Sequence, residues 1–174
     1  MIDIRSETPD DHDAINQVID QAFTDEFGKS DGKLAIVDML RNLDDLPFFL
    51  SLVAQRDNQI VGHILFSSVT IEDAPQIKAA VLGPLAVLPE FQNKGIGSAL
   101  VEQGLELCWA QHIQAVFLTG HPEYYPRFGF KPITETRLKT IFNTPVDMVR
   151  ELAEHCLDDA EGLVKYPKPW ERFL

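Results

Sequence analysis

Two cysteines are all that this 174-residue sequence contains, and they form no C-x-x-C pair. So few cysteines exclude a secreted disulfide scaffold, and we expect Cys108 and Cys156 to be buried thiols. Long hydrophobic runs are missing too, because no apolar stretch nears the roughly 20 residues of a membrane span. The N-terminal MIDIRSETPDD lacks the basic and apolar regions of a signal peptide. We therefore expect a cytoplasmic protein without a membrane partner.

Basic residues are scarce as well, with 15 lysines and arginines against 27 aspartates and glutamates, which gives a net charge of -12. Without a basic cluster the chain has no site for a phosphate backbone, so nucleic acid is excluded as a partner. An acidic surface favours cationic acceptors, although it also serves solubility alone. No histidine and cysteine cluster has metal-ligand spacing, and no Ser-His-Asp set can be assembled, so we expect no metal.

The composition that is present is typical of a globular protein, with 45% hydrophobic and 24% charged residues. We expect one domain over residues 1–174. Helical periodicity and strand alternation both occur, separated by turn residues, and Thr8-Pro9-Asp10-Asp11 is typical of a helix start. The predicted strands are 2–6, 47–55, 60–71, 78–88, 113–119 and 162–166, and the predicted helices are 9–23, 34–43 and 96–111.

The order of the predicted strands and helices indicates the directions of the strands in the sheet. The strands 47–55, 60–71 and 78–88 follow one another through short turns, and the sheet up to residue 88 is predicted to be antiparallel. The strands 78–88 and 113–119 are joined by a helix, which makes a βαβ unit and predicts that these two strands are parallel. Residues 146–151 are ambiguous, because Thr144-Pro145 is a possible helix start while Met148 and Val149 suit the inward side of a strand.

The turn Gln92-Asn93-Lys94-Gly95-Ile96-Gly97 lies where a predicted strand meets a predicted helix. The first N–H groups of a helix lack intrahelical acceptors, and the helix dipole adds positive charge there. Gly95 and Gly97 would let an anion approach the main chain, and Lys94 would add a cation. A glycine-containing connection without a ligand is the alternative. A dinucleotide fingerprint is excluded because Leu100 occupies its third glycine position, and no P-loop motif is present.

Two further elements accompany this turn: the extended Leu85-Ala86-Val87 before it, and Tyr125-Pro126-Arg127-Phe128-Gly129-Phe130 one crossover later. Together the three resemble the GCN5-related N-acetyltransferase (GNAT) superfamily, and residues 1–134 fit its order of elements. The resemblance implies an α/β (α+β) fold with a mixed, mostly antiparallel sheet of about seven strands, flanked by helices and containing a splayed parallel pair. The ending, MVREL…EGLVKYPKPW, is similar to the bacterial acetyltransferases typified by YhbS, which favours a strand at 146–151.

The resemblance also implies acetyl-CoA as cosubstrate and assigns site residues. Pantetheine would bond to the main chain of the strand before the turn, and the Val87 N–H would polarise the thioester carbonyl. The turn would bind the pyrophosphate, and Tyr125 would be the general acid that protonates the leaving thiolate. A packing role is the alternative for Tyr125, and we expect Tyr124 to be structural. The implied cofactor-binding residues are Leu85, Ala86, Val87, Gln92, Asn93, Lys94, Gly95, Ile96, Gly97 and Ser98.

The general base has no assignment, because Val81 occupies the position where some relatives have a glutamate. A water chain, an acceptor that arrives neutral, or a carboxylate elsewhere would have to serve. His121 is either a proton relay or an exposed histidine, and His63 is expected in the core. Asp25 and Glu26 lie where relatives form an acceptor wall, with a solvated loop as the alternative.

These residues favour an acyl-CoA-dependent N-acyltransferase that moves an acetyl group to a primary amine of a small molecule, amino acid or peptide. A regulatory module that binds acyl-CoA without turnover and acts through a protein partner is the alternative from another class. Retention of Tyr125 favours the enzyme, and the missing carboxylate at Val81 favours the module. A nucleotide-binding protein lacks supporting residues. The acceptor pocket has no common motif, and the protein could be a monomer or a homodimer.

Overall fold

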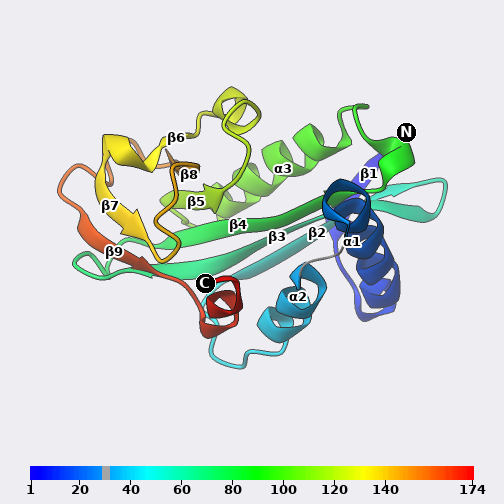
Figure 1. The fold of residues 1–174 in the computed structure, drawn as a ribbon, viewed down its shortest axis with the longest axis horizontal. Coiled ribbons are helices and arrows are strands. Elements are labelled where there is room, and N and C mark those ends of the chain that lie inside the picture. The colour runs from blue at the N-terminus through cyan, green and yellow to red at the C-terminus, as the bar shows by residue number, and fades with distance from the viewer. Residues whose placement is uncertain (29–31) are drawn as a thin grey trace.

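A mixed sheet lies at the centre of the computed structural model, which describes residues 1–28 and 32–174, with only the backbone of residues 25–27 (Figure 1). Within these residues seven strands follow the order β1-β2-β3-β4-β5-β8-β6, and a β7–β9 pair joins the far end of β3. Among the described strands only the β4–β5 and β7–β9 pairs are parallel. The strands are β1 (Asp3–Ser6), β2 (Phe49–Arg56), β3 (Gln59–Ile71), β4 (Ala79–Val87), β5 (Ala115–Thr119), β6 (Lys131–Pro132), β7 (Arg137–Thr140), β8 (Asp147–Glu151) and β9 (Glu161–Lys165).

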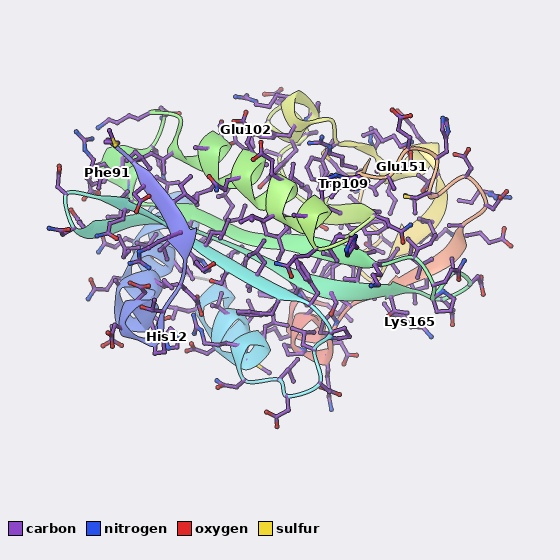
Figure 2. All side chains as sticks on the ribbon, turned by 180° about the vertical axis from the view of Figure 1, so that it is seen from behind. His12, Phe91, Glu102, Trp109, Glu151 and Lys165 are labelled. Carbon is purple, nitrogen blue, oxygen red and sulfur yellow. The ribbon has the colours of Figure 1, made fainter. Side chains whose placement is uncertain are left out.

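Helices cover both faces of the sheet (Figure 1). Helices α1 (His12–Phe27) and α2 (Lys33–Arg41) lie on one face and α3 (Ile96–Ala110) on the other, where Figure 2 shows it from behind with Trp109 near its end. In the part of the chain that the structure describes, no helix has the length and apolarity of a membrane span. The short 3-10 helices are Pro9–Asp11, Pro89–Phe91, Tyr125–Phe128, Ile133–Glu135 and Lys168–Phe173.

The alternation of side chains along β3 decides what each face contacts. A Cβ on Gly62 would lie 3.0 Å from Leu100 of α3, and a Cβ on Gly104 of α3 would lie 2.3 Å from the Phe66 ring, so this face of β3 packs closely against α3. His63 points to the opposite face, towards α1 and α2, and is fully buried there. The absence of side chains at Gly62 and Gly104 therefore sets the close approach of α3 to the sheet.

Local signals in the sequence place most element boundaries correctly. The Thr8 N–H donates to Asp11 Oδ2 over 2.7 Å at the start of the first helical segment. Asp57 and Asn58 both have positive φ, 48° and 64°, which fits the tight hairpin between β2 and β3.

The C-terminal half of the structure tests the prediction for residues 146–151 and the expected burial of the two cysteines. Residues 147–151 pair antiparallel with β5, so the strand prediction for 146–151 is confirmed and the helix alternative is wrong. Cys108 is buried as expected, but Cys156 is only half-buried because it lies in the loop after β8.

The parallel pair β4–β5 separates soon after it begins, as the family resemblance implied. Pairing covers only Ala79–Val81 of β4 against Ala115–Phe117 of β5. On its other edge β4 has a register shift, because Leu82 opposes Phe66 and Leu85 opposes Ile64, which leaves two residues of β4 opposite one of β3. Such a bulge bends its strand. The second half of β4 therefore diverges from β5 and has an edge that no strand of the described chain covers.

Candidate active site

A cleft of about 1190 Å³ opens where β4 and β5 diverge. One wall is the second half of β4, and the N-terminus of α3 forms one end of the cleft. The segment after β5 forms the opposite wall, and residues from the β7–β8 loop and the C-terminus close the other end. The cleft therefore joins the glycine turn to Tyr125, as the sequence predicts.

The glycine turn reaches its shape through left-handed backbone at two residues. Gly95 is the N-cap of α3 with φ 83°, and Asn93 has φ 57°. A Cβ on Gly95 would meet nothing within 4 Å, so Gly95 is required for its backbone conformation rather than for space. A Cβ on Gly97 would lie 3.2 Å from Tyr124 Oη and 3.8 Å from Val87 Cγ2. Gly97 therefore keeps the cleft open beside the first N–H groups of α3.

Tyr124 lies at this turn, although it was expected to be structural. Its Oη is 3.3 Å from Ser98 Oγ, and its ring is stacked under the Arg127 guanidinium at 4.5 Å. Both Tyr124 and Arg127 line the cleft. The motif around Tyr125 could not indicate this contact, because Ser98 and Tyr124 are 26 residues apart in the sequence.

Two of the residues assigned to cofactor binding do not line the cleft. The Lys94 ammonium donates to the Glu90 carbonyl over 2.7 Å and lies 5.4 Å from the Phe91 ring centre, which holds it outside the cleft. Phe91 is labelled at the turn in Figure 2. Ala86 is buried, with its side chain on the far face of β4. The other eight, Leu85, Val87, Gln92, Asn93, Gly95, Ile96, Gly97 and Ser98, line it.

The main chain of β4 presents polar groups to the cleft. The Leu88 N–H donates to the Val61 carbonyl of β3. Because successive residues of a strand direct their N–H and C=O groups to opposite edges, those of Val87 point away from β3. The Gln92 side chain confirms this direction, since its Nε2 donates to the Val87 carbonyl over 2.9 Å. The Val87 N–H is thus directed to the edge of β4 that β5 leaves uncovered.

Tyr125 begins the 3-10 helix after β5 and lies inside an aromatic cluster. Its ring contacts Tyr124 and Phe130 edge to face, with ring centres 5.0 and 5.9 Å apart. Only 8% of the residue is exposed, yet it lines the cleft. A Cβ on Gly120 would lie 2.6 Å from the Tyr125 ring, so the residue that follows β5 packs directly against it. Packing thus fixes the orientation of Tyr125.

The far end of the cleft is aromatic. Phe142 and Tyr166 meet edge to face with ring centres 5.5 Å apart, and Tyr166 and Trp170 do so at 5.6 Å. Phe173 contacts Trp170 at 6.1 Å. Tyr166 Oη and Trp170 Nε1 are buried and have no hydrogen-bond partner among the described residues. Burial, aided by the negative charge of Asp147, raises the pKa of the Tyr166 hydroxyl, which therefore stays protonated. We call Phe142, Tyr166, Trp170 and Phe173 the aromatic wall.

Other candidate residues have different positions. His63 lies in the core, where its Nε2 is 2.8 Å from Ser51 Oγ, and burial lowers its pKa to about 4. His121 and Val81 line the cleft, and Val81 supplies no carboxylate there. The side chains of Asp25 and Glu26 lie outside the described residues. Across the described chain no group of three or more histidine, cysteine or carboxylate side chains could hold a metal ion.

Comparison with known proteins gives this cleft a family context. The sequence model of the Acetyltransferase (GNAT) family matches residues 13–130. The uncharacterized N-acetyltransferase YjhQ of Escherichia coli is 44% identical over 86 residues, which cover 48% of this chain and 46% of YjhQ. A second uncharacterized N-acetyltransferase, CT2212 of Chlorobaculum tepidum, is 35% identical over 82 residues, which cover 47% of this chain and 49% of CT2212. The chain thus spans about half the length of the curated relatives it matches.

Solved structures match over almost the whole chain. A GNAT family acetyltransferase from Brucella melitensis, crystallised with acetyl-CoA, is 33% identical with a TM-score of 0.81 over 98% of both chains. YhbS from Escherichia coli, crystallised with CoA, is 29% identical with a TM-score of 0.86 over 99% of this chain and 93% of its own. The family match, these structures and the splayed β4–β5 pair agree: the chain belongs to the GNAT acetyltransferase family.

Proposed function

We propose that this protein transfers an acetyl group from acetyl-CoA directly to a primary amine. The amine nitrogen bonds to the acetyl carbon, the C–S bond breaks, the thiolate leaving group takes a proton, and the amine loses one. The observation that supports this best is the cleft itself, in which the α3 N-terminus, the uncovered edge of β4 and Tyr125 meet. Relatives crystallised with acetyl-CoA and CoA share this fold.

The cleft fits a CoA thioester at both of its cofactor elements. A pyrophosphate would be held by the first N–H groups of α3, where the dipole is positive and Gly97 presents no side chain. Pantetheine is an extended chain with amide groups, so it would bond to Leu85 and Val87 as an added strand would. The residues proposed to bind the cofactor are therefore the eight of the β4 segment and the turn that line the cleft, with Tyr124 added.

The residues near the divergence of β4 and β5 would perform the chemistry. The Val87 N–H would stabilise the developing oxyanion, a role for which typical contributions are about 10²–10³ in rate. Tyr125 would protonate the thiolate as general acid. Packing by Gly120 and Phe130 orients its ring, which favours one fixed geometry for proton transfer.

A second candidate function is a non-catalytic acyl-CoA-binding module that acts through a protein partner. Two observations favour it: Val81 leaves β4 without a carboxylate, and Tyr125 is largely buried. Such a module needs the turn and the β4 edge but no proton donor.

We further propose a single domain over residues 1–174, while a cytoplasmic location and a monomeric or homodimeric state stay predictions.

Two experiments test the proposal. Calorimetric titration with acetyl-CoA, and with NAD as comparator, should show binding of acetyl-CoA alone, and Gly97→Asp should abolish it by placing a carboxylate against the pyrophosphate. Unchanged affinity in Gly97→Asp would show that the turn is not the cofactor site. The residual question, whether binding leads to turnover, requires an assay of CoA release with an amine panel.

The two adjacent tyrosines provide a matched pair for that assay. Tyr125→Phe should lower kcat by about 10²–10⁴, the usual contribution of a general acid, while acetyl-CoA affinity is kept. Tyr124→Phe is the same change one residue away, and it should act on acetyl-CoA affinity through Ser98 rather than on kcat. Full turnover in Tyr125→Phe would remove that residue from the mechanism, and no turnover in the wild type with every amine would favour the regulatory module.

A further inference from the structure

A buried carboxylate behind the cleft receives four hydrogen bonds. Asp147, at the start of β8, is 1% exposed. Its Oδ1 accepts from Thr119 Oγ1 and Thr144 Oγ1, each over 2.7 Å. Its Oδ2 accepts from Thr140 Oγ1 over 2.5 Å and from the Thr144 N–H over 3.0 Å. Each carboxylate oxygen thus accepts two hydrogen bonds, so Asp147 has no free acceptor position for a ligand.

Two of these threonines reach the cleft and one does not. Thr119 and Thr144 line it, whereas Thr140 is 2% exposed and does not. A hydroxyl has a single proton, and both cleft threonines donate theirs to Asp147. Towards the cleft they therefore present only oxygen lone pairs, which the carboxylate behind them makes stronger acceptors. This pair of hydroxyls is suited to a group that donates N–H hydrogens.

The pair lies where the reaction is proposed to occur. The last β5 residue that pairs with β4 is Phe117, and Thr119 stands two residues further, where the strands have separated. The next residue, Gly120, packs against the Tyr125 ring. Thr119 and the proposed general acid thus line the same cleft, at the opening between β4 and β5.

The surroundings of the pair define the rest of the ligand. The β7–β8 loop supplies both Thr144 and Phe142, so the hydroxyl pair adjoins the aromatic wall. An apolar ring on the ligand would gain contact with this wall.

We propose that Thr119 and Thr144 form the subsite for the acceptor amino group, and that the acceptor is a primary amine on an apolar body of aromatic size. The two hydroxyls accept the amine N–H hydrogens and direct its lone pair towards the opening between β4 and β5. Asp147 is a positioning residue, which acts through the two threonines. This inference rests on the proposed acetyl transfer, whose acceptor it specifies.

The test compares two variants of one residue, with 2-phenylethylamine as the probe. Thr119→Val replaces the hydroxyl by a methyl group of similar size, and Thr119→Ser restores the hydroxyl. Loss of a hydrogen bond to the neutral amine should lower kcat/KM for 2-phenylethylamine by about two- to tenfold in Thr119→Val. Thr119→Ser should recover most of it, and the KM for acetyl-CoA should be unchanged in both. Wild type should prefer 2-phenylethylamine to spermidine, which has no apolar ring to contact the aromatic wall.

The outcomes separate this inference from the proposed function. Equal kcat/KM in wild type and Thr119→Val, equal losses in the valine and serine variants, or preference for spermidine would overturn the inference while leaving acetyl transfer intact. If the wild type binds acetyl-CoA but acetylates no amine, acetyl transfer fails, and calorimetry of 2-phenylethylamine with the CoA-bound protein still tests the subsite. There, weaker binding in Thr119→Val supports it, and equal or absent binding refutes it. Thr144→Val repeats the test should Thr119→Val fold poorly by circular dichroism.

Discussion

Acidification should destabilise this protein through one buried histidine. His63 lies on β3 between the sheet and the helices α1 and α2, fully buried, with its Nε2 against Ser51 Oγ. Burial lowers its pKa from 6.5 to about 4, because the charged imidazolium would lose its hydration there. The nearby Glu7 carboxylate opposes this effect and Arg41 adds to it. The folded protein therefore keeps His63 neutral well below pH 6.

The magnitude follows from proton linkage. Because the pKa of His63 is lower in the folded state, the unfolded chain binds the proton first, and stability falls as the pH decreases from 6.5 to about 4. Between pH 7 and pH 5 the loss in the free energy of unfolding should be about 2 kcal/mol. Glu7 and Asp11 also have lowered pKa values, but their contribution is lost only below about pH 4.5, outside this interval.

Urea denaturation at pH 7 and pH 5 measures this loss directly. His63→Gln is the control, since glutamine can bond to Ser51 without titrating, and its own cost does not matter because the readout is the difference between the two pH values. That difference should be about 2 kcal/mol smaller in His63→Gln than in the wild type. A wild-type stability that is the same at both pH values, or an identical pH dependence in both proteins, would refute the reasoning.

Two further predictions concern packing and thiol reactivity. Gly104→Ala would place a Cβ 2.3 Å from the buried Phe66 ring, so it should destabilise the protein by about 1–3 kcal/mol despite the better helix propensity of alanine, and a midpoint in urea at or above that of the wild type would contradict this. Burial raises the pKa of Cys108 to about 12 and that of Cys156 to about 11, so at pH 8 less than about one thiol in a thousand is ionised. Ellman's reagent should therefore modify neither thiol at an appreciable rate in native protein and both in urea, and rapid native labelling would show that the protein opens around them.

Periodicity was sufficient for most of the fold because the long strands and helices each have a face in the core. The parallel β4–β5 pair and the antiparallel strands before it are confirmed. The strand β7 was missed, since its four residues, Arg137–Thr140, are too short for alternation to be recognised. Its partner β9 was predicted, but the pairing of β9 with β3 and β7 joins segments distant in sequence, and no local signal records it.

In the candidate site, too, contiguous features could be predicted from the sequence and contacts between distant residues could not. The glycine turn could be located from sequence because strand end, glycines and helix start are contiguous. Lys94 was assigned to the anion by its position alone, whereas the structure holds its ammonium on the Glu90 carbonyl. The hydrogen bond between Asp147 and Thr119 could not be predicted from the sequence, because the two residues are 28 positions apart. Tertiary packing brings such distant residues together, and their spacing in the sequence does not predict it.

The aromatic wall lies in a part of the sequence that can change independently of the glycine turn. The family match ends at residue 130 and includes the glycine turn and Tyr125. The aromatic wall begins at Phe142, in chain that joins the sheet through β8 and β9. Substitutions in this later part can alter the shape of the cleft without disturbing the turn. Exchange of residues 131–174 between relatives would therefore test whether this part sets the proposed acceptor preference while the glycine turn is kept.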